Sequence, residues 1–223
     1  SMTNPPIHVI VERGRLTRED ADAALERLEV IGALEDLSPC ELIIEAAPEQ
    51  LAIKHDIFRA ASAAAPRAVL ASNTSSIPIS AIAPAAADPT LVVGMHFFNP
   101  APAMRLVEVI AGLDSGDAAL ALASATGEAM GKRVIAAADV PGFLVNRCSR
   151  PFGLEALRLV QERVADVETI DTVMRRGGGY RMGPFELQDL VGIDVGFAVA
   201  QSFAALSFGE PRWRPSPLSA QMV

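Results

Sequence analysis

Two ionisable residues stand inside apolar stretches that a short turn separates. His96 lies in residues 91–98 and Glu108 in residues 106–110, and both stretches have the apolar, β-branched character of buried strands. A buried carboxylate is costly unless it is paired, and the turn residues 99–102 would bring the imidazole to it. A histidine held by a glutamate has a fixed tautomer and titrates near neutral pH, so the pair predicts a general base. The alternative is a structural ion pair.

The composition limits the classes of function. The chain has 223 residues, enough for one large domain or two small ones. Half of the residues (50%) are hydrophobic, which is enough for a buried core. Its 27 acidic and 19 basic residues give a net charge of -8, which disfavours nucleic acid or an acidic membrane as the main partner. Cys40 and Cys148 are far apart and have no metal-binding spacing, so we expect no metal site and a reducing, cytoplasmic setting. No apolar run reaches membrane-spanning length.

Strand and helix patterns alternate in the first part of the chain, which predicts an α/β domain with a parallel sheet between helices. After residues 141–142 the pattern changes to apolar-periodic helices, predicted at residues 143–164, 167–175 and 184–208. We therefore expect one domain over residues 1–139 and an all-helical domain over residues 140–223. The apolar faces of the helical part favour a partner helix bundle and a homodimer.

Four motifs follow one another along the chain: Ala-Ser-Asn-Thr-Ser-Ser at 71–76, Gly-Met-His-Phe-Phe-Asn-Pro at 94–100, Leu-Val-Glu-Val-Ile at 106–110, and Val-Pro-Gly-Phe-Leu-Val-Asn-Arg at 140–147. In this order they resemble the L-3-hydroxyacyl-CoA dehydrogenase family, which includes the bacterial 3-hydroxybutyryl-CoA dehydrogenases. A fifth stretch, residues 183–192, is similar to the helical domain of that family. The resemblance implies a Rossmann-like NAD-binding domain followed by a helical dimerisation domain, with the active site in the cleft between them.

The resemblance also implies catalytic roles, in the NAD-dependent oxidation of an L-3-hydroxyacyl-CoA to a 3-oxoacyl-CoA. His96 is similar to the base that takes the proton of the C3 hydroxyl, and Glu108 to the partner that orients the imidazole. Ser75 and Asn146 match residues that hold the substrate oxygen and the thioester end. From the residues alone, Ser75 could instead cap a helix, and Asn146 could be a capping or core amide.

NAD is the implied cofactor, and Glu49, Lys54, Ser75 and Asn99 match family positions that contact it. Independently, residues 73–76 follow a predicted strand, and open α/β sheets bind ligands at the carboxyl ends of their strands. Glu49 and Lys54 begin a predicted helix, where a glutamate favours the helix dipole and a lysine is usually solvated. A role apart from the cofactor is therefore the alternative for these two residues.

The sequence departs from the family where the pyrophosphate should bind. Dinucleotide folds place a glycine-rich turn after the first strand, but the strand pattern at residues 7–10 is followed only by the isolated Gly14 and Gly32. By comparison with the family, we expect a βαβ unit of roughly 30 residues or more to be absent between residues 10 and 11. We expect the chain to join two segments of a longer polypeptide, whose intact mass exceeds that of the printed sequence. The family also usually continues beyond the last residue, into a basic glycine-rich segment.

Two other functions remain open from the sequence. The missing glycine turn favours a non-enzymatic relative, of the lambda-crystallin kind or a dimerising remnant that cannot hold NAD; NADH fluorescence titration would identify it. A dehydrogenase of free 3-hydroxy acids is the closer alternative, and acetoacetyl-CoA compared with acetoacetate would distinguish it. The implied acyl-CoA metabolism is compatible with fatty-acid β-oxidation, butanoate metabolism or the degradation of aromatic acids.

Overall fold

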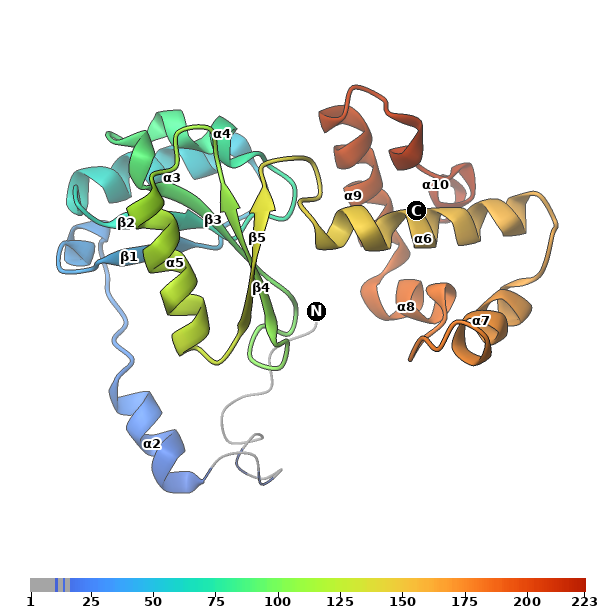
Figure 1. The fold of residues 1–223 in the computed structure, drawn as a ribbon, viewed down its shortest axis with the longest axis horizontal. Coiled ribbons are helices and arrows are strands. Elements are labelled where there is room, and N and C mark those ends of the chain that lie inside the picture. The colour runs from blue at the N-terminus through green and yellow to red at the C-terminus, as the bar shows by residue number, and fades with distance from the viewer. Residues whose placement is uncertain (1–10, 12–13, 15–16) are drawn as a thin grey trace. The chain divides into compact units, whose positions relative to one another are not determined.

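A five-stranded sheet organises the first of two units, Ser1–Asp139. The computed structural model describes residues 11, 14 and 17–223, so the strand predicted at residues 7–10 lies outside the described part. The predicted alternation of strands and helices is confirmed in this unit (Figure 1). Its strands lie side by side in chain order: β1 (Leu42–Glu45), β2 (Val69–Ser72), β3 (Val92–Phe97), β4 (Leu106–Ala111) and β5 (Arg133–Ala138).

One neighbouring pair of the described strands is antiparallel. β3 and β4 run in opposite directions, whereas β1 with β2, β2 with β3 and β4 with β5 are parallel. A parallel return needs a crossover of about a dozen residues or more, and the connection between Phe97 and Leu106 is shorter. The α/β fold class is confirmed. The short connection makes β3 and β4 an antiparallel pair, in which His96 lies opposite Glu108.

Helices cover both faces of the sheet, because consecutive strand residues point to opposite sides. Val93 and Met95 pack against α5 (Asp117–Ala129) on one face. Gly94, between them, points to the other face, toward Ile79 of α4 (Ile79–Ile82). The other described helices of this unit are α2 (Arg18–Glu26), η1 (Leu34–Leu37), α3 (Leu51–Ala64), η2 (Ala83–Ala85) and η3 (Pro89–Leu91).

Small residues let α5 lie close to the sheet. Ala119 and Ala123 are buried in the core that β2, β3 and β4 form with this helix. A Cβ at Gly127 would lie 2.8 Å from Cγ2 of Val134 and 3.0 Å from Cγ1 of Val107. The alanine-rich sequence of the helix therefore sets its distance from β4 and β5.

Asp139 ties the end of the first unit to the start of α4. Its carboxylate accepts hydrogen bonds from the N–H groups of Ile79 and Ser80, both at 2.8 Å, and from the Ser80 hydroxyl at 2.6 Å. The first N–H groups of a helix have no partner within the helix, so Asp139 caps α4 from a distant part of the sequence. The chain therefore leaves the sheet at a fixed point.

The second unit, Val140–Val223, is helical. The helix predicted at residues 184–208 is in fact two helices, because Gly192 adopts a φ of 100° that favours glycine. The short helix α10 was not predicted. Ala156, Leu157, Ile170 and Phe185 form a core in this unit. Its elements are α6 (Val145–Gln161), α7 (Val167–Arg176), α8 (Pro184–Val191), α9 (Ile193–Leu206), η4 (Pro211–Trp213) and α10 (Pro217–Met222).

Within residues 11, 14 and 17–223, no single helix has both the length and the apolarity to cross a membrane. The pair α8 and α9 meets these criteria only when taken together, and it is bent by 98° at the break.

Gly94 offers a test of the packing between the sheet and α4. A Cβ there would lie 2.8 Å from the Ile110 Cβ and 2.9 Å from the Ile79 Cδ1. We expect Gly94→Ala to lower the free energy of unfolding by about 1–3 kcal/mol, because Ile110 on β4 and Ile79 on α4 are both buried and cannot shift freely. Gly32→Ala is the control, since a Cβ at Gly32 meets nothing within 4 Å. Urea titrations that give both variants the same stability would contradict this packing.

Candidate active site

The predicted pair of His96 and Glu108 forms across the β3–β4 register. The two residues are direct cross-strand partners, and Nδ1 of His96 lies 2.7 Å from Oε2 of Glu108. Their side chains are 7% and 0% exposed. An ionised carboxylate can only accept a hydrogen bond, so it holds the proton on Nδ1 and leaves the lone pair of the neutral imidazole on Nε2. This geometry suits a general base.

The carboxyl end of β3 carries further polar groups beside the histidine. Asn73, which follows β2, accepts a hydrogen bond through Oδ1 from the Phe97 N–H at 2.8 Å, so it ties the ends of β2 and β3 together. The Phe98 ring lies against the His96 imidazole, with ring centroids 4.5 Å apart. Asn99, the next residue, is exposed in the following turn. The structure thus places Asn99 and the residues after β2 at the same edge of the sheet as His96.

A second buried carboxylate, Glu45, ends β1. The Lys54 ammonium lies 2.9 and 3.0 Å from its two oxygens, and both residues are almost fully buried. The Ser72 hydroxyl donates to Oε2 of Glu45 at 2.7 Å, and the Ala47 N–H donates to Oε1. A buried charge must be paired and hydrogen-bonded to be tolerated, and both conditions are met here.

Lys54 also links this pair to Glu49, whose Oε2 lies 3.4 Å from the ammonium. The other oxygen of Glu49, Oε1, faces the 74–76 loop, which consists of Thr74, Ser75 and Ser76. It accepts hydrogen bonds from the Thr74 and Ser76 hydroxyls at 2.7 and 2.9 Å. The N–H groups of Ser75 and Ser76 donate to the same atom, both at 3.0 Å. One carboxylate thus holds the whole loop.

The pKa of Glu49 reflects these contacts. Burial by itself raises the pKa of this carboxyl, but hydrogen bonds from the 74–76 loop and the charge of Lys54 together lower it below the ordinary value. The ionised form is therefore the one that the loop recognises.

The structure brings Glu49, Lys54 and Ser75 together but gives Lys54 no solvent. Its side chain is 1% exposed, so the alternative of a solvated lysine is wrong. Burial also separates the ammonium from any ligand in solvent, whereas Ser75 is half-buried and Glu49 is 36% exposed. Lys54 is placed to position Glu49 and, through it, the loop that contains Ser75.

Asn146 belongs to the second unit, where it lies in the first turn of α6. The turn before the helix has a φ of 78° at Gly142, and a Cβ there would lie 3.2 Å from the Phe203 ring and 3.4 Å from the Asn146 Cβ. Phe203 is fully buried and packs edge-on against Trp213, with ring centroids 5.2 Å apart. The turn that leads to Asn146 thus depends on a glycine, for its positive φ and for its close approach to Phe203.

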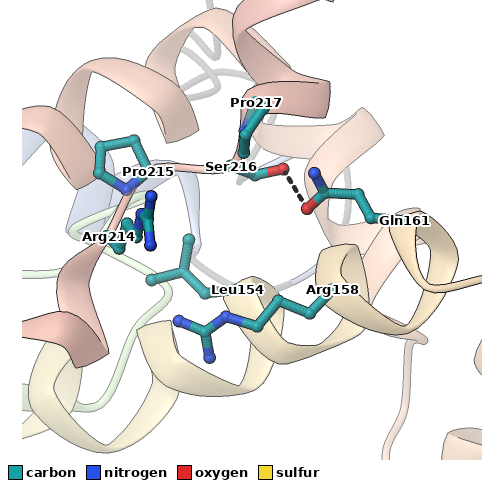
Figure 2. A pocket seen from close by; sticks show the side chains of 7 residues that line it. All are labelled: Leu154, Arg158, Gln161, Arg214, Pro215, Ser216 and Pro217. Atoms are coloured by element: carbon teal, nitrogen blue, oxygen red, sulfur yellow. Dashed lines mark hydrogen bonds between the residues drawn. The ribbon is translucent and has the colours of Figure 1, made fainter.

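A small hollow of about 170 Å³ lies further along α6. Figure 2 shows Arg158 and Arg214 beside Leu154, and the Ser216 hydroxyl donating to Oε1 of Gln161 at 3.1 Å. None of the predicted site residues lines this hollow. The contact between Ser216 and Gln161 attaches the start of α10 to α6, so it serves the packing of this unit.

Sequence reasoning missed Glu45 and Ser72. The signal was present, because Glu45 is a carboxylate in an apolar strand, the same feature that identifies Glu108. Its partner was harder to find: Lys54 comes from the following helix, and the spacing of the two residues predicts a contact only when the turn between strand and helix is known.

The buried pair on β1 and α3 gives a stability prediction. We expect Lys54→Met to lower the free energy of unfolding by about 3–5 kcal/mol, because it leaves Glu45 buried without a counter-charge. The double variant Lys54→Met/Glu45→Gln should recover a large part of the loss. Arg59→Met is the control, because Arg59 pairs with Asp56 on the same helix but is 65% exposed, and exposed pairs contribute roughly 0–1 kcal/mol. Equal losses for Lys54→Met and Arg59→Met in denaturant titrations would refute the buried pair.

The lowered pKa of Glu49 gives a pH prediction. A carboxyl whose pKa is lower in the folded state stabilises the protein fully above its ordinary pKa, and this contribution is lost as the pH falls through the lowered value. The stability difference between the unsubstituted protein and Glu49→Gln should therefore shrink as unfolding is measured from neutral pH into the acid range. A difference that is constant over that range would rule out the ionised carboxylate as the group that holds the loop.

Comparisons with known proteins identify the family of the chain. Residues 3–140 match the NAD binding domain of 3-hydroxyacyl-CoA dehydrogenase, and residues 142–223 match the C-terminal domain of the same family. The 3-hydroxyadipyl-CoA dehydrogenase of Escherichia coli is 42% identical over 96% of this chain, which spans 45% of that relative. A probable 3-hydroxybutyryl-CoA dehydrogenase of Deinococcus radiodurans is 40% identical over 95% of this chain, which spans 76% of it.

Solved structures give the same result. The crystal structure of (S)-3-hydroxybutyryl-CoA dehydrogenase from Ralstonia eutropha superposes with a TM-score of 0.92 at 34% identity, over 97% of this chain and 76% of that one. The predicted resemblance, its fold class and its cofactor NAD are confirmed. The chain belongs to the 3-hydroxyacyl-CoA dehydrogenase family of NAD-dependent oxidoreductases.

Proposed function

We propose that this chain oxidises an L-3-hydroxyacyl-CoA to the 3-oxoacyl-CoA, with His96 as the general base. The observation that carries the proposal is the buried 2.7 Å contact between Nδ1 of His96 and Glu108. The names of the relatives include hydroxybutyryl and hydroxyadipyl thioesters. The thioester of a 3-hydroxy acid is therefore the substrate class that we propose.

His96 would take the proton of the C3 hydroxyl on Nε2. Glu108 fixes the ring orientation and stabilises the imidazolium that forms, because its charge lies beside the ring in a water-poor environment. Ser75 and Asn146 would hold the substrate oxygen and the thioester end by hydrogen bonds. The roles of these residues rest on their chemistry and on the family motifs.

Glu49, Ser75 and Asn99 are the residues that we propose to contact the cofactor, and Lys54 would act through Glu49. NAD, when bound, accepts the hydride from C3 of the substrate. The polar groups at the carboxyl ends of β1 and β2 fit a dinucleotide there. In the described part of the chain no strand is followed by a turn with the G-x-G-x-x-G spacing, so the absence of a pyrophosphate-binding unit between residues 10 and 11 stays a prediction.

We further propose a homodimer in the cytoplasm. Leu187, Leu190 and Val195 on α8 and α9 are 45–53% exposed, and such apolar side chains favour burial against a second copy. Both cysteines are free thiols, which fits a reducing compartment.

Substitution of His96 tests the proposed base. We expect His96→Gln to lower turnover by about 10²–10⁴-fold, because a positioned base contributes that much, while the affinity for acetoacetyl-CoA changes little. His55→Gln is the control, since His55 lies in the same unit and its ring contacts the Ala81 carbonyl at 2.7 Å. Turnover by His96→Gln near that of the control would remove His96 from the mechanism.

A further inference from the structure

A basic residue stands one helical turn beyond Asn146 on α6. Arg150 follows Asn146 by four residues, and residues four apart lie on the same face of a helix, about 6 Å apart along its axis. The next position on this face, Gly153, has no side chain, and a Cβ there would meet nothing within 4 Å. Asn146, Arg150 and Gly153 thus share one face of α6, and the space beside this face is open at Gly153.

Within the described part of the chain, Arg150 has no recorded carboxylate partner, unlike three other arginines of its unit. Arg158, Arg175 and Arg212 each pair with a glutamate. Among the described residues, no carboxylate or hydrogen-bond acceptor contacts Arg150, although its side chain is half-buried. Burial lowers the pKa of Arg150, and no neighbouring acid offsets this effect.

A guanidinium stays charged even when it is partly desolvated. A half-buried charge without a partner has lost part of its hydration without compensation, so the position favours an anion that comes from outside the described residues. A carboxylate matches the planar, two-pronged guanidinium and its single charge.

We propose that Arg150 binds the carboxylate at the far end of a dicarboxylic 3-hydroxyacyl-CoA whose thioester end is held at Asn146. The inference rests on the proposed function and names a substrate class within it. An acyl chain laid along α6 from Asn146 would reach Arg150 after a few methylene groups. A chain that ends in a methyl group would leave the guanidinium unpaired. Arg150 is thus a specificity residue that favours substrates with a second carboxylate.

Two substrates with the same six carbon atoms test this role. L-3-Hydroxyadipyl-CoA and L-3-hydroxyhexanoyl-CoA differ only in the terminal carboxylate, and the ratio of their kcat/KM values measures its recognition. We expect Arg150→Gln to lower this ratio by about 10- to 100-fold, as for the loss of a charged hydrogen bond. Arg150→Lys should retain part of the preference, because it keeps the charge but not the fork.

Arg158→Gln is the matched control, because Arg158 lies two turns further along the same helix and pairs with Glu155. It should leave the ratio unchanged. Equal losses for both substrates in Arg150→Gln would overturn the proposal, since they would indicate contact with a CoA phosphate, which both substrates share, or a structural role. An unchanged ratio would overturn it as well.

Binding gives a readout that is independent of turnover. The dissociation constants of adipyl-CoA and hexanoyl-CoA, measured by calorimetry on the full chain, should differ in favour of adipyl-CoA, and Arg150→Gln should remove the difference. If neither hydroxy substrate is oxidised, the proposed function fails, yet this binding ratio still decides the role of Arg150. Equal affinities for the two thioesters in the unsubstituted protein would contradict it.

Discussion

A carboxylate inside an apolar sheet must be paired, and the first unit meets this requirement twice. Glu108 on β4 pairs with His96 on the neighbouring strand, and Glu45 on β1 pairs with Lys54 on α3. The same physical constraint yields different results. A histidine partner would give a general base with a fixed tautomer, whereas a lysine gives a rigid buried anchor. The proposed chemistry depends on the first pair and the shape of the sheet edge on the second.

The anchor acts on the site through a chain of contacts. Lys54 bridges Glu45 and Glu49, and Glu49 in turn holds the N–H and hydroxyl groups of the 74–76 loop. Because the loop follows β2, and Asn73 ties that strand end to β3, the polar edge is held from both sides. Rigid positioning of this kind is what hydrogen-bonding residues need in order to hold a reacting group.

Much of the first unit could be predicted because its strands are short apolar runs, and the turn after β3 made the contact between His96 and Glu108 predictable. The burial of Lys54 could not be predicted, since a lysine near the start of a helix is normally solvated and its partner lies on a strand. The break at Gly192 was also missed, because the apolar period continues across it and only the backbone shows the change. The contact of Asp139 with α4 joins residues too distant in sequence for any local pattern to reveal.

Glu108 fixes the imidazole of His96 so that Nδ1 carries the proton and Nε2 carries the lone pair. Nitrogen-15 NMR of labelled histidine measures this directly, because the two tautomers of neutral imidazole give distinct shifts at each nitrogen. We expect the Nδ1–H tautomer for neutral His96, and a mixture of tautomers in Glu108→Leu. A neutral His96 that carries its proton mainly on Nε2 in the unsubstituted protein would contradict the account.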